Sequence, residues 1–313
     1  MAQYSIGIDL GGTNLRAAAI SDSGEMLHKI SGRTHLSAGR EAVVADMVTS
    51  IIALRGELGA AELVGVGVGA PGFIILERGV ITDSPNLPGF HDFPLRDAIE
   101  QQLGAPVVLE NDANAAALGE KWMGAGRGVE DLVLLTLGTG IGGGIIVGGK
   151  ILHGFVGMAG ELGHTTVVPT GNPCGCGNQG CLEKHASATA VTAMARMMGL
   201  GDNLTSEHVY RLATGVDEEQ STKATAIFLQ MGQTLGVALG NLASIFNFPL
   251  YLLSGGMLPA WDLFAPPMIA ECRRRSFVFR NTPTRIEKAT LGNEAGLFGA
   301  AYLPFQKSAF QNK

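Results

Sequence analysis

Four short apolar runs, typical of β-strands, each end close to a glycine, which is the pattern of buried strands followed by tight turns. The first run continues through Gly11-Gly12-Thr13 into Leu15–Ile20. The third continues in the same way through Gly138-Thr139-Gly140 into Ile145–Val147. Both segments predict a strand hairpin with a glycine tip, and their separation of 127 residues indicates a duplicated lobe. The four runs are Tyr4–Leu10, Leu63–Gly69, Leu132–Leu137 and Pro249–Leu253.

Apolar residues recur at helical spacing between these runs, so predicted helices alternate with predicted strands. Such an order predicts an α/β fold. The stretch Leu235–Leu253 is long enough to span a bilayer, but Asn241, Ser244, Asn247 and Pro249 interrupt it. We therefore expect a buried helix, a turn and a core strand there, and no membrane partner. The predicted helices are Arg40–Glu57, Asn114–Trp122, Ser187–Met198 and Ser221–Phe246.

The two predicted lobes differ in length. Gly72 follows Gly11 by 61 residues, whereas Gly255 follows Gly138 by 117 residues. The second lobe therefore carries an insertion of 56 residues in this interval.

The insertion contains four residues that together suit a metal ion: His164, Cys174, Cys176 and Cys181. Three thiolates and one imidazole form a closed tetrahedral donor set, which is typical of structural Zn²⁺. The cysteine spacings contain no redox Cys-x-x-Cys pair, and the alternative is three buried free thiols.

The composition excludes several classes of protein. Charged residues make up 16% of the 313 residues, against about 25% in an average globular chain, and hydrophobic residues make up 46%. These values exclude a disordered chain, and the net charge of −6 argues against a nucleic-acid partner. The only dense basic cluster, Arg273–Arg275, is expected to be the solvated end of a helix. The N-terminal residues show no secretory signal, so the expected location is cytoplasmic.

Three glycine patterns imitate nucleotide-binding motifs. Gly144–Lys150 fits a P-loop, but Ile151 stands where a Ser or Thr is required. Gly67–Gly72 and Gly138–Gly143 fit a dinucleotide fingerprint, yet β-prone residues follow both where a helix should begin. Glu161 lies near the spacing of a ribose-binding acid, which keeps the second match open as a weaker alternative.

The hairpin at Asp9–Asn14 is a more specific pattern. It places a carboxylate at a strand end before a glycine tip, where backbone N–H groups can cradle phosphates. Asp9 could hold Mg²⁺, usually through water. The alternative is an ordinary hairpin turn, but a second glycine tip at Gly138–Gly140 favours a clamp for a triphosphate.

The chain resembles the ROK sugar kinases, within the actin/hexokinase/Hsp70 ATPase superfamily. The resemblance rests on motifs that occur in the family's order from residue 4 to about residue 300. It implies two ribonuclease-H-like lobes with a central cleft and a zinc-binding insertion at about residues 154–190. The expected domains are residues 1–118 with about 297–313, and residues 119–296. The motifs are Asp9–Asn14, Glu110–Asn114, Leu137–Gly140, Gly160–His164, Cys174–Glu183 and Ser254–Gly256.

The resemblance also implies roles for individual residues, with ATP, Mg²⁺ and structural Zn²⁺ as cofactors. Asp112 follows the apolar strand Val107–Leu109 and is the expected catalytic base; read without the family, it is a helix N-cap. The expected sugar contacts are Gly72, Asn86, Asn111, Asp112, Glu161, His164 and Glu183. The expected nucleotide contacts are Asp9, Gly11, Gly12, Thr13, Asn14, Gly138, Thr139, Gly140, Gly255 and Gly256.

The segment Leu182–Thr189 is similar to the glucokinase branch of the family, which makes glucose the expected substrate. N-acetylglucosamine, N-acetylmannosamine, mannose and fructose are the alternatives. An alternative of another class is a catalytically silent sugar-binding regulator. The family's repressors carry a winged helix before the first hairpin. The residues before Asp9 leave no room for such a helix, which argues against a repressor. The resemblance further implies a homodimer or homotetramer.

Overall fold

The computed structural model describes residues 3–84 and 86–311. The chain divides into two compact units. The first comprises Met1–Glu130, Gly144–Gly160 and Thr290–Lys313, and the second comprises Asp131–Gly143 and Glu161–Ala289.

The first unit contains a mixed five-stranded sheet in the order β3-β2-β1-β4-β7. β2 pairs antiparallel with both β1 and β3, whereas β4 pairs parallel with both β1 and β7. The predicted strands at residues 4–10 and 63–69 are thereby confirmed. The strands are β1 (Gln3–Leu10), β2 (Asn14–Ser21), β3 (Met26–Arg33), β4 (Glu62–Ala70) and β7 (Val107–Asn111).

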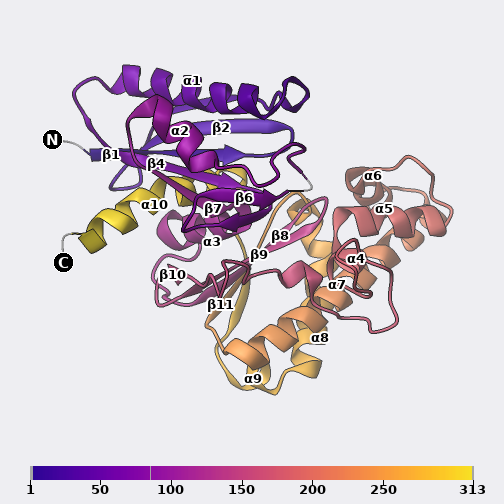
Figure 1. The fold of residues 1–313 in the computed structure, drawn as a ribbon. Helices are drawn as coiled ribbons and strands as arrows, with labels where there is room; N and C mark the ends of the chain where they lie inside the picture. Colours follow the sequence, from indigo (N-terminus) through magenta and orange to yellow (C-terminus); the bar gives the residue numbers. More distant parts are fainter. Residues whose placement is uncertain (1–2, 85, 312–313) are drawn as a thin grey trace. The chain divides into compact units, whose positions relative to one another are not determined.

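Helices cover both faces of this sheet (Figure 1). On one face, α1 (Arg40–Leu58) and α2 (Leu95–Leu103) bury the apolar side chains of alternate strand residues such as Ile6 and Ile8. On the other face, α10 (Ala295–Gln311) packs against Ala18 and Ile20 and lies beside α3 (Asp112–Met123).

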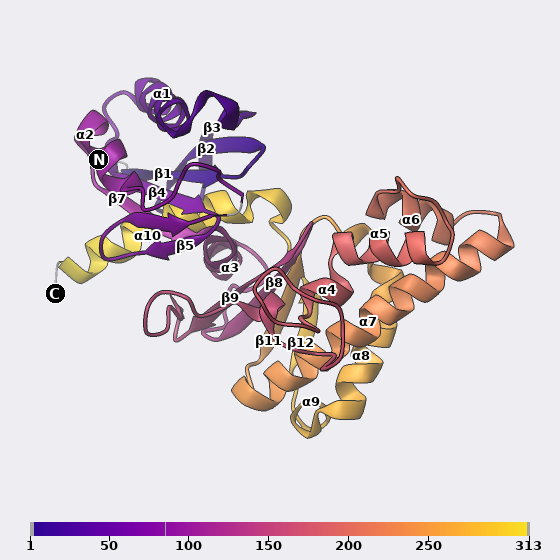
Figure 2. The ribbon, with the colours of Figure 1, turned by 45° about the vertical axis from the view of Figure 1, so that its right-hand side comes forward.

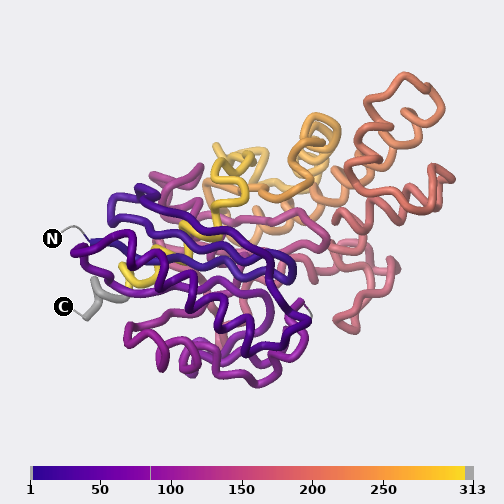
Figure 3. Tube along the Cα trace, turned by 90° about the horizontal axis from the view of Figure 1, so that it is seen from above, coloured from indigo at the N-terminus to yellow at the C-terminus, as the bar shows by residue number. Residues whose placement is uncertain are grey.

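Two glycines allow α10 to approach the sheet. Gly7 on β1 and Gly67 on β4 are neighbours in the sheet. A Cβ atom on Gly7 would clash with the carbonyl oxygen of Leu297, and one on Gly67 with that of Ala300. In Figure 3 the yellow trace of α10 crosses behind the indigo strands of the first sheet, and α10 contacts both β1 and β4. These two glycines therefore allow a close approach of two backbones, and Gly67 serves packing rather than nucleotide binding.

The second sheet has the order β10-β9-β8-β11-β12. Its central strand is followed by a hairpin strand on one side and by parallel strands on the other, as in the first sheet. The predicted duplication and the ribonuclease-H-like α/β fold are confirmed. The strands are β8 (Leu132–Leu137), β9 (Ile141–Val147), β10 (Lys150–Ile151), β11 (Leu250–Ser254) and β12 (Arg285–Lys288).

The long helix α7 (Glu218–Phe246) packs along α8 (Trp261–Arg275) in the second unit (Figure 2). It is long and apolar enough to cross a membrane, but 67% of its most apolar window is buried in the protein, as in a core helix. β11 follows after a short turn, which confirms the predicted helix, turn and strand. The other helices of this unit are η2 (Leu162–His164), α4 (Glu183–Ala186), α5 (Ala188–Met197), α6 (Ser206–Ala213), η3 (Leu258–Ala260) and α9 (Phe277–Asn281).

In the described part of the chain, no helix begins directly after any of the three glycine patterns that fit a P-loop or a dinucleotide fingerprint. Gly144–Lys150 lies in β9 and the turn to β10, while Gly67–Gly72 leads from β4 into β5. Gly138–Gly143 leads into β9, so the dinucleotide alternative is excluded there as well. The remaining elements are η1 (Leu36–Ala38), β5 (Phe73–Ile75), β6 (Val80–Asp83) and η4 (Gly292–Glu294).

Candidate active site and metal centre

The first glycine tip joins β1 to β2 and is fixed by one hydrogen bond within the hairpin and one from Thr34. The N–H of Gly11 donates to the carbonyl oxygen of Asn14 at 2.9 Å, and the hydroxyl of Thr34 donates to the carbonyl oxygen of Gly11 at 2.7 Å. A Cβ atom on Gly12 would lie 2.8 Å from the backbone oxygen of Asn86. The fold thus places Asn86, an expected sugar contact, directly against the tip that is expected to hold phosphates.

Asp9 lies at the end of β1, opposite Arg16 on β2. The guanidinium of Arg16 is 3.3 Å from the Asp9 carboxylate, and its positive charge lowers the pKa of Asp9. Burial has the larger effect, and with the negative charges of Asp112 and Glu294 it raises the pKa of Asp9 to about 6. The fold therefore brings Asp9 and Asp112 close enough to repel each other. A divalent cation at this position would relieve that repulsion.

This raised pKa predicts that Asp9 costs stability at neutral pH. The native state favours the protonated acid, so its contribution to the free energy of unfolding is largest below about pH 4 and is lost as the pH rises through about 6. Without Mg²⁺, Asp9→Asn should raise the free energy of unfolding at pH 8 by about 1–3 kcal/mol and change it less at pH 5. Urea unfolding at both pH values tests this, with the exposed Asp22→Asn as control. An equal change at both pH values would contradict it.

Asp112 is the first residue of α3, and Asn111 caps the helix. The side-chain oxygen of Asn111 accepts from the N–H groups of Ala113 and Asn114 at 2.9 and 3.2 Å. The reading of Asp112 as the N-cap is therefore wrong, because Asn111 already fills that position. The Asp112 carboxylate accepts from the Ala113 N–H at 2.8 Å, and burial raises its pKa. The Asn111 amide also donates to the carbonyl oxygen of Gly72 at 3.4 Å.

A buried carboxylate behind Asp112 received no role from the sequence. Glu110 accepts from the Asn111 N–H at 2.9 Å and from the Asn114 amide at 3.0 Å. Its other oxygen lies 2.7 Å from Nε2 of His153, and this hydrogen bond raises the pKa of His153. These bonds fix the strand-to-helix turn that carries Asp112. The charge of Glu110 at the end of an apolar strand was a signal in the sequence that this residue has a special role. Its partner His153 could not be found in the same way, because it lies 43 residues further along the chain.

The second glycine tip and its neighbours lie in the second unit. The N–H of Gly138 donates to the carbonyl oxygen of Gly140 at 3.0 Å, and Thr139 is exposed at the tip. Gly255 has a φ of +99° and packs so closely on Leu137 that a side chain would clash with its carbonyl oxygen. Gly256 has open space around it. The fold therefore places Gly255 against Leu137, the residue that precedes the Gly138–Gly140 tip.

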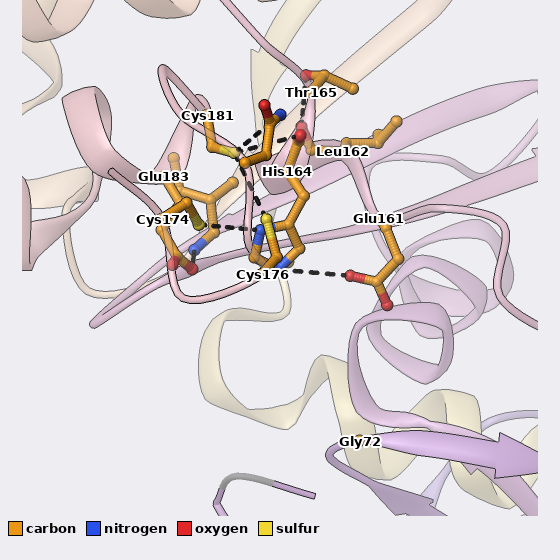
Figure 4. Close-up of polar contacts among 12 residues, drawn as sticks. Gly72, Glu161, Leu162, His164, Thr165, Cys174, Cys176, Cys181 and Glu183 are labelled. Carbon is orange, nitrogen blue, oxygen red and sulfur yellow. Dashed lines mark hydrogen bonds and ion pairs between the residues drawn. The ribbon is translucent and has the colours of Figure 1, made fainter. Parts of the chain in front are cut away.

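The four expected metal ligands gather at one point of the insertion (Figure 4). Their donor atoms all lie within 4.8 Å of one another. Nδ1 of His164 is 3.5 Å from Sγ of Cys174, and Sγ of Cys176 is 3.8 Å from Sγ of Cys181. Tetrahedral zinc with ordinary bond lengths separates a nitrogen from a sulfur by about 3.6 Å and two sulfurs by about 3.8 Å. The donor set and its spacing therefore fit zinc.

The other nitrogen of the His164 ring faces Glu161. Nε2 lies 3.9 Å from the Glu161 carboxylate (Figure 4). A metal held at Nδ1 would fix the ring and its tautomer, leaving Nε2 as a hydrogen-bond donor. Glu183 begins α4 two residues after Cys181, and its carboxylate accepts from the Ile141 N–H at 3.0 Å. The insertion thus carries all three expected sugar contacts of the second unit.

Comparison with known proteins gives one family. The ROK family profile matches residues 5–307. The glucokinase of Halalkalibacterium halodurans is 35% identical over 328 residues, which cover 99% of this chain and 98% of that protein. The crystal structure of a ROK hexokinase from Thermus thermophilus superposes with a TM-score of 0.88 at 36% identity, covering 98% of this chain and 99% of that one.

A further solved structure contains ligands. It is a ROK family glucokinase from Streptomyces griseus in complex with glucose and AMPPNP. Its TM-score is 0.79 at 35% identity, and the match covers 97% of this chain and 99% of that one.

Proposed function

The chain belongs to the ROK family, and from this we propose that it transfers the terminal phosphoryl group of ATP to the 6-hydroxyl of a hexose, with glucose as the substrate. The single observation that carries the proposal is that Asp9 and Asp112 lie close enough in the first unit for the charge of Asp112 to raise the pKa of Asp9. One carboxylate stands at a glycine tip suited to phosphates, and the other begins a helix with a raised pKa suited to accepting a proton. The glucokinase relatives support glucose.

In the proposed reaction Asp112 accepts the proton of the attacking sugar hydroxyl. Asn111 and Glu110 hold the start of α3, so the Asp112 carboxylate stays in one orientation. Mg²⁺, when bound, would neutralise charge on the phosphates, and Asp9 is the proposed residue to hold it through water. The proposed nucleotide contacts are Gly11, Gly12, Thr13 and Asn14 in the first unit and Gly138, Thr139, Gly140, Gly255 and Gly256 in the second.

The proposed sugar contacts are the backbone of Gly72 together with side-chain carboxylates, amides and one imidazole. Such groups pair with vicinal hydroxyls and discriminate against analogues that lack a hydroxyl far better than an apolar pocket does. Zinc would have a structural role only, by holding the loop that carries His164 and Glu183. The contacts are Gly72, Asn86, Asn111, Glu161, His164 and Glu183.

Turnover of ATP to ADP with Mg²⁺ across a panel of sugars tests the proposal. We expect strong turnover with glucose and weaker turnover with mannose, fructose, N-acetylglucosamine and N-acetylmannosamine, because the relatives' names point to glucose. Turnover with another sugar alone would keep the kinase and overturn the substrate. Sugar binding without turnover on any sugar would overturn the kinase and favour a catalytically silent regulator.

A further inference from the structure

Three hydrogen bonds join the second glycine tip to the segment Glu183–Thr189, which follows the metal cluster. The N–H of Ile141 donates to the Glu183 carboxylate at 3.0 Å. The N–H of Ala188 donates to the carbonyl oxygen of Gly138 at 2.9 Å, and the hydroxyl of Thr189 donates to that of Thr139 at 2.7 Å. All of these residues belong to the second unit, so the bonds are internal to it.

The tip depends on hydrogen bonds from this segment because its own residues offer almost no side-chain contacts. Gly138 and Gly140 have no side chains, and the Thr139 side chain is exposed. The first turn of α5 offers rigid support, since the Ser187 hydroxyl is fully inside the protein and caps the helix by accepting from the Ala190 N–H at 3.1 Å. Ala188 and Thr189 therefore come from a fixed helix end.

We propose that Thr189 is a positioning residue for the nucleotide, which it serves by holding the carbonyl of Thr139 and so the backbone of the tip. The inference rests on the proposed function only in taking this tip as a nucleotide contact. The Ala-Ser-Ala-Thr segment at residues 186–189 belongs to the stretch that resembles the glucokinase branch. In this proposal the same segment also fixes the Gly138–Gly140 tip.

The test is the affinity for AMPPNP with Mg²⁺, measured by calorimetry on the full chain. Thr189→Val keeps the branched shape and removes the donor, so the Kd for AMPPNP should rise about two- to tenfold, as for the loss of one hydrogen bond. The Kd for glucose should not change. Thr189→Ser should restore the wild-type Kd for AMPPNP, because it keeps the hydroxyl.

A matched control lies one turn further along α5. The Thr192 hydroxyl donates to the carbonyl oxygen of Thr189 at 2.9 Å and makes no bond to the tip. Thr192→Val therefore makes the same chemical change on the same helix, and it should leave both Kd values unchanged.

Amide hydrogen exchange without ligands separates positioning from direct contact. If Thr189 holds the tip, the amides of residues 138–141 should exchange faster in Thr189→Val than in the wild type. Unchanged exchange with a weaker Kd would overturn positioning in favour of direct contact, and an unchanged Kd would overturn the inference altogether. Wild-type protein that binds no AMPPNP would instead contradict the proposed function, so the two failures are distinguishable.

Discussion

Replacing Asp112 with Asn is expected to lower kcat by about 10²- to 10⁴-fold, the range lost with a general base. Burial raises the pKa of Asp112, which makes its carboxylate a better proton acceptor near neutral pH. The amide of Asn cannot accept that proton. Its oxygen can still accept from the Ala113 N–H, so the start of α3 and the sugar affinity should be retained.

The measurement combines ADP release with calorimetric binding of glucose. Asp97→Asn is the matched control, because Asp97 lies in the first turn of α2 in the same unit and its side chain is 54% exposed. It should change neither kcat nor the Kd for glucose. An unchanged kcat in Asp112→Asn would show that the base lies elsewhere, and lost glucose binding in a natively folded variant would assign Asp112 to binding.

The elements that the sequence predicts are those with a strong hydrophobic pattern, either a continuous apolar run or a helical spacing. Buried parallel strands such as β4 and β11 are continuous apolar runs, and α1 has apolar residues at helical spacing along its whole length. β3 has no such run, because it is an edge strand without a buried residue. α8 contains Pro266 and Pro267, which are ordinarily signals against a helix interior.

In the site, too, the sequence predicts the local motifs but not the long-range contacts that support them. Its glycine tips and the His/Cys₃ set are local patterns, so the sequence alone places them. The bonds that hold them join residues far apart in the chain, such as Glu110 with His153 and Thr139 with Thr189. In such a pair, the sequence pattern around one residue does not predict which distant residue it will bond to. The supporting contacts therefore required the structure, whereas the motifs did not.

Purified protein should contain one zinc ion per chain, and Cys181→Ser should lose it. Cys181 is fully buried and its sulfur is one of the four donor atoms that lie within 4.8 Å of one another, so its loss leaves the donor set one ligand short. An ion bound only by the native state stabilises it by about 4 kcal/mol when its free concentration is about 1,000 times the Kd. The loss of zinc should therefore lower the free energy of unfolding by several kcal/mol and weaken sugar binding through His164 and Glu183.

Elemental analysis and urea unfolding measure the two effects, and Cys272→Ala provides the control. Cys272 is also fully buried, but it lies in α8 and outside the metal cluster. Its substitution should cost packing energy while zinc remains at one per chain. A chelator should destabilise the wild type and the Cys272 variant but leave the Cys181 variant unaffected. Folded, active wild-type protein without zinc would show that the His/Cys₃ cluster holds the insertion together without a metal.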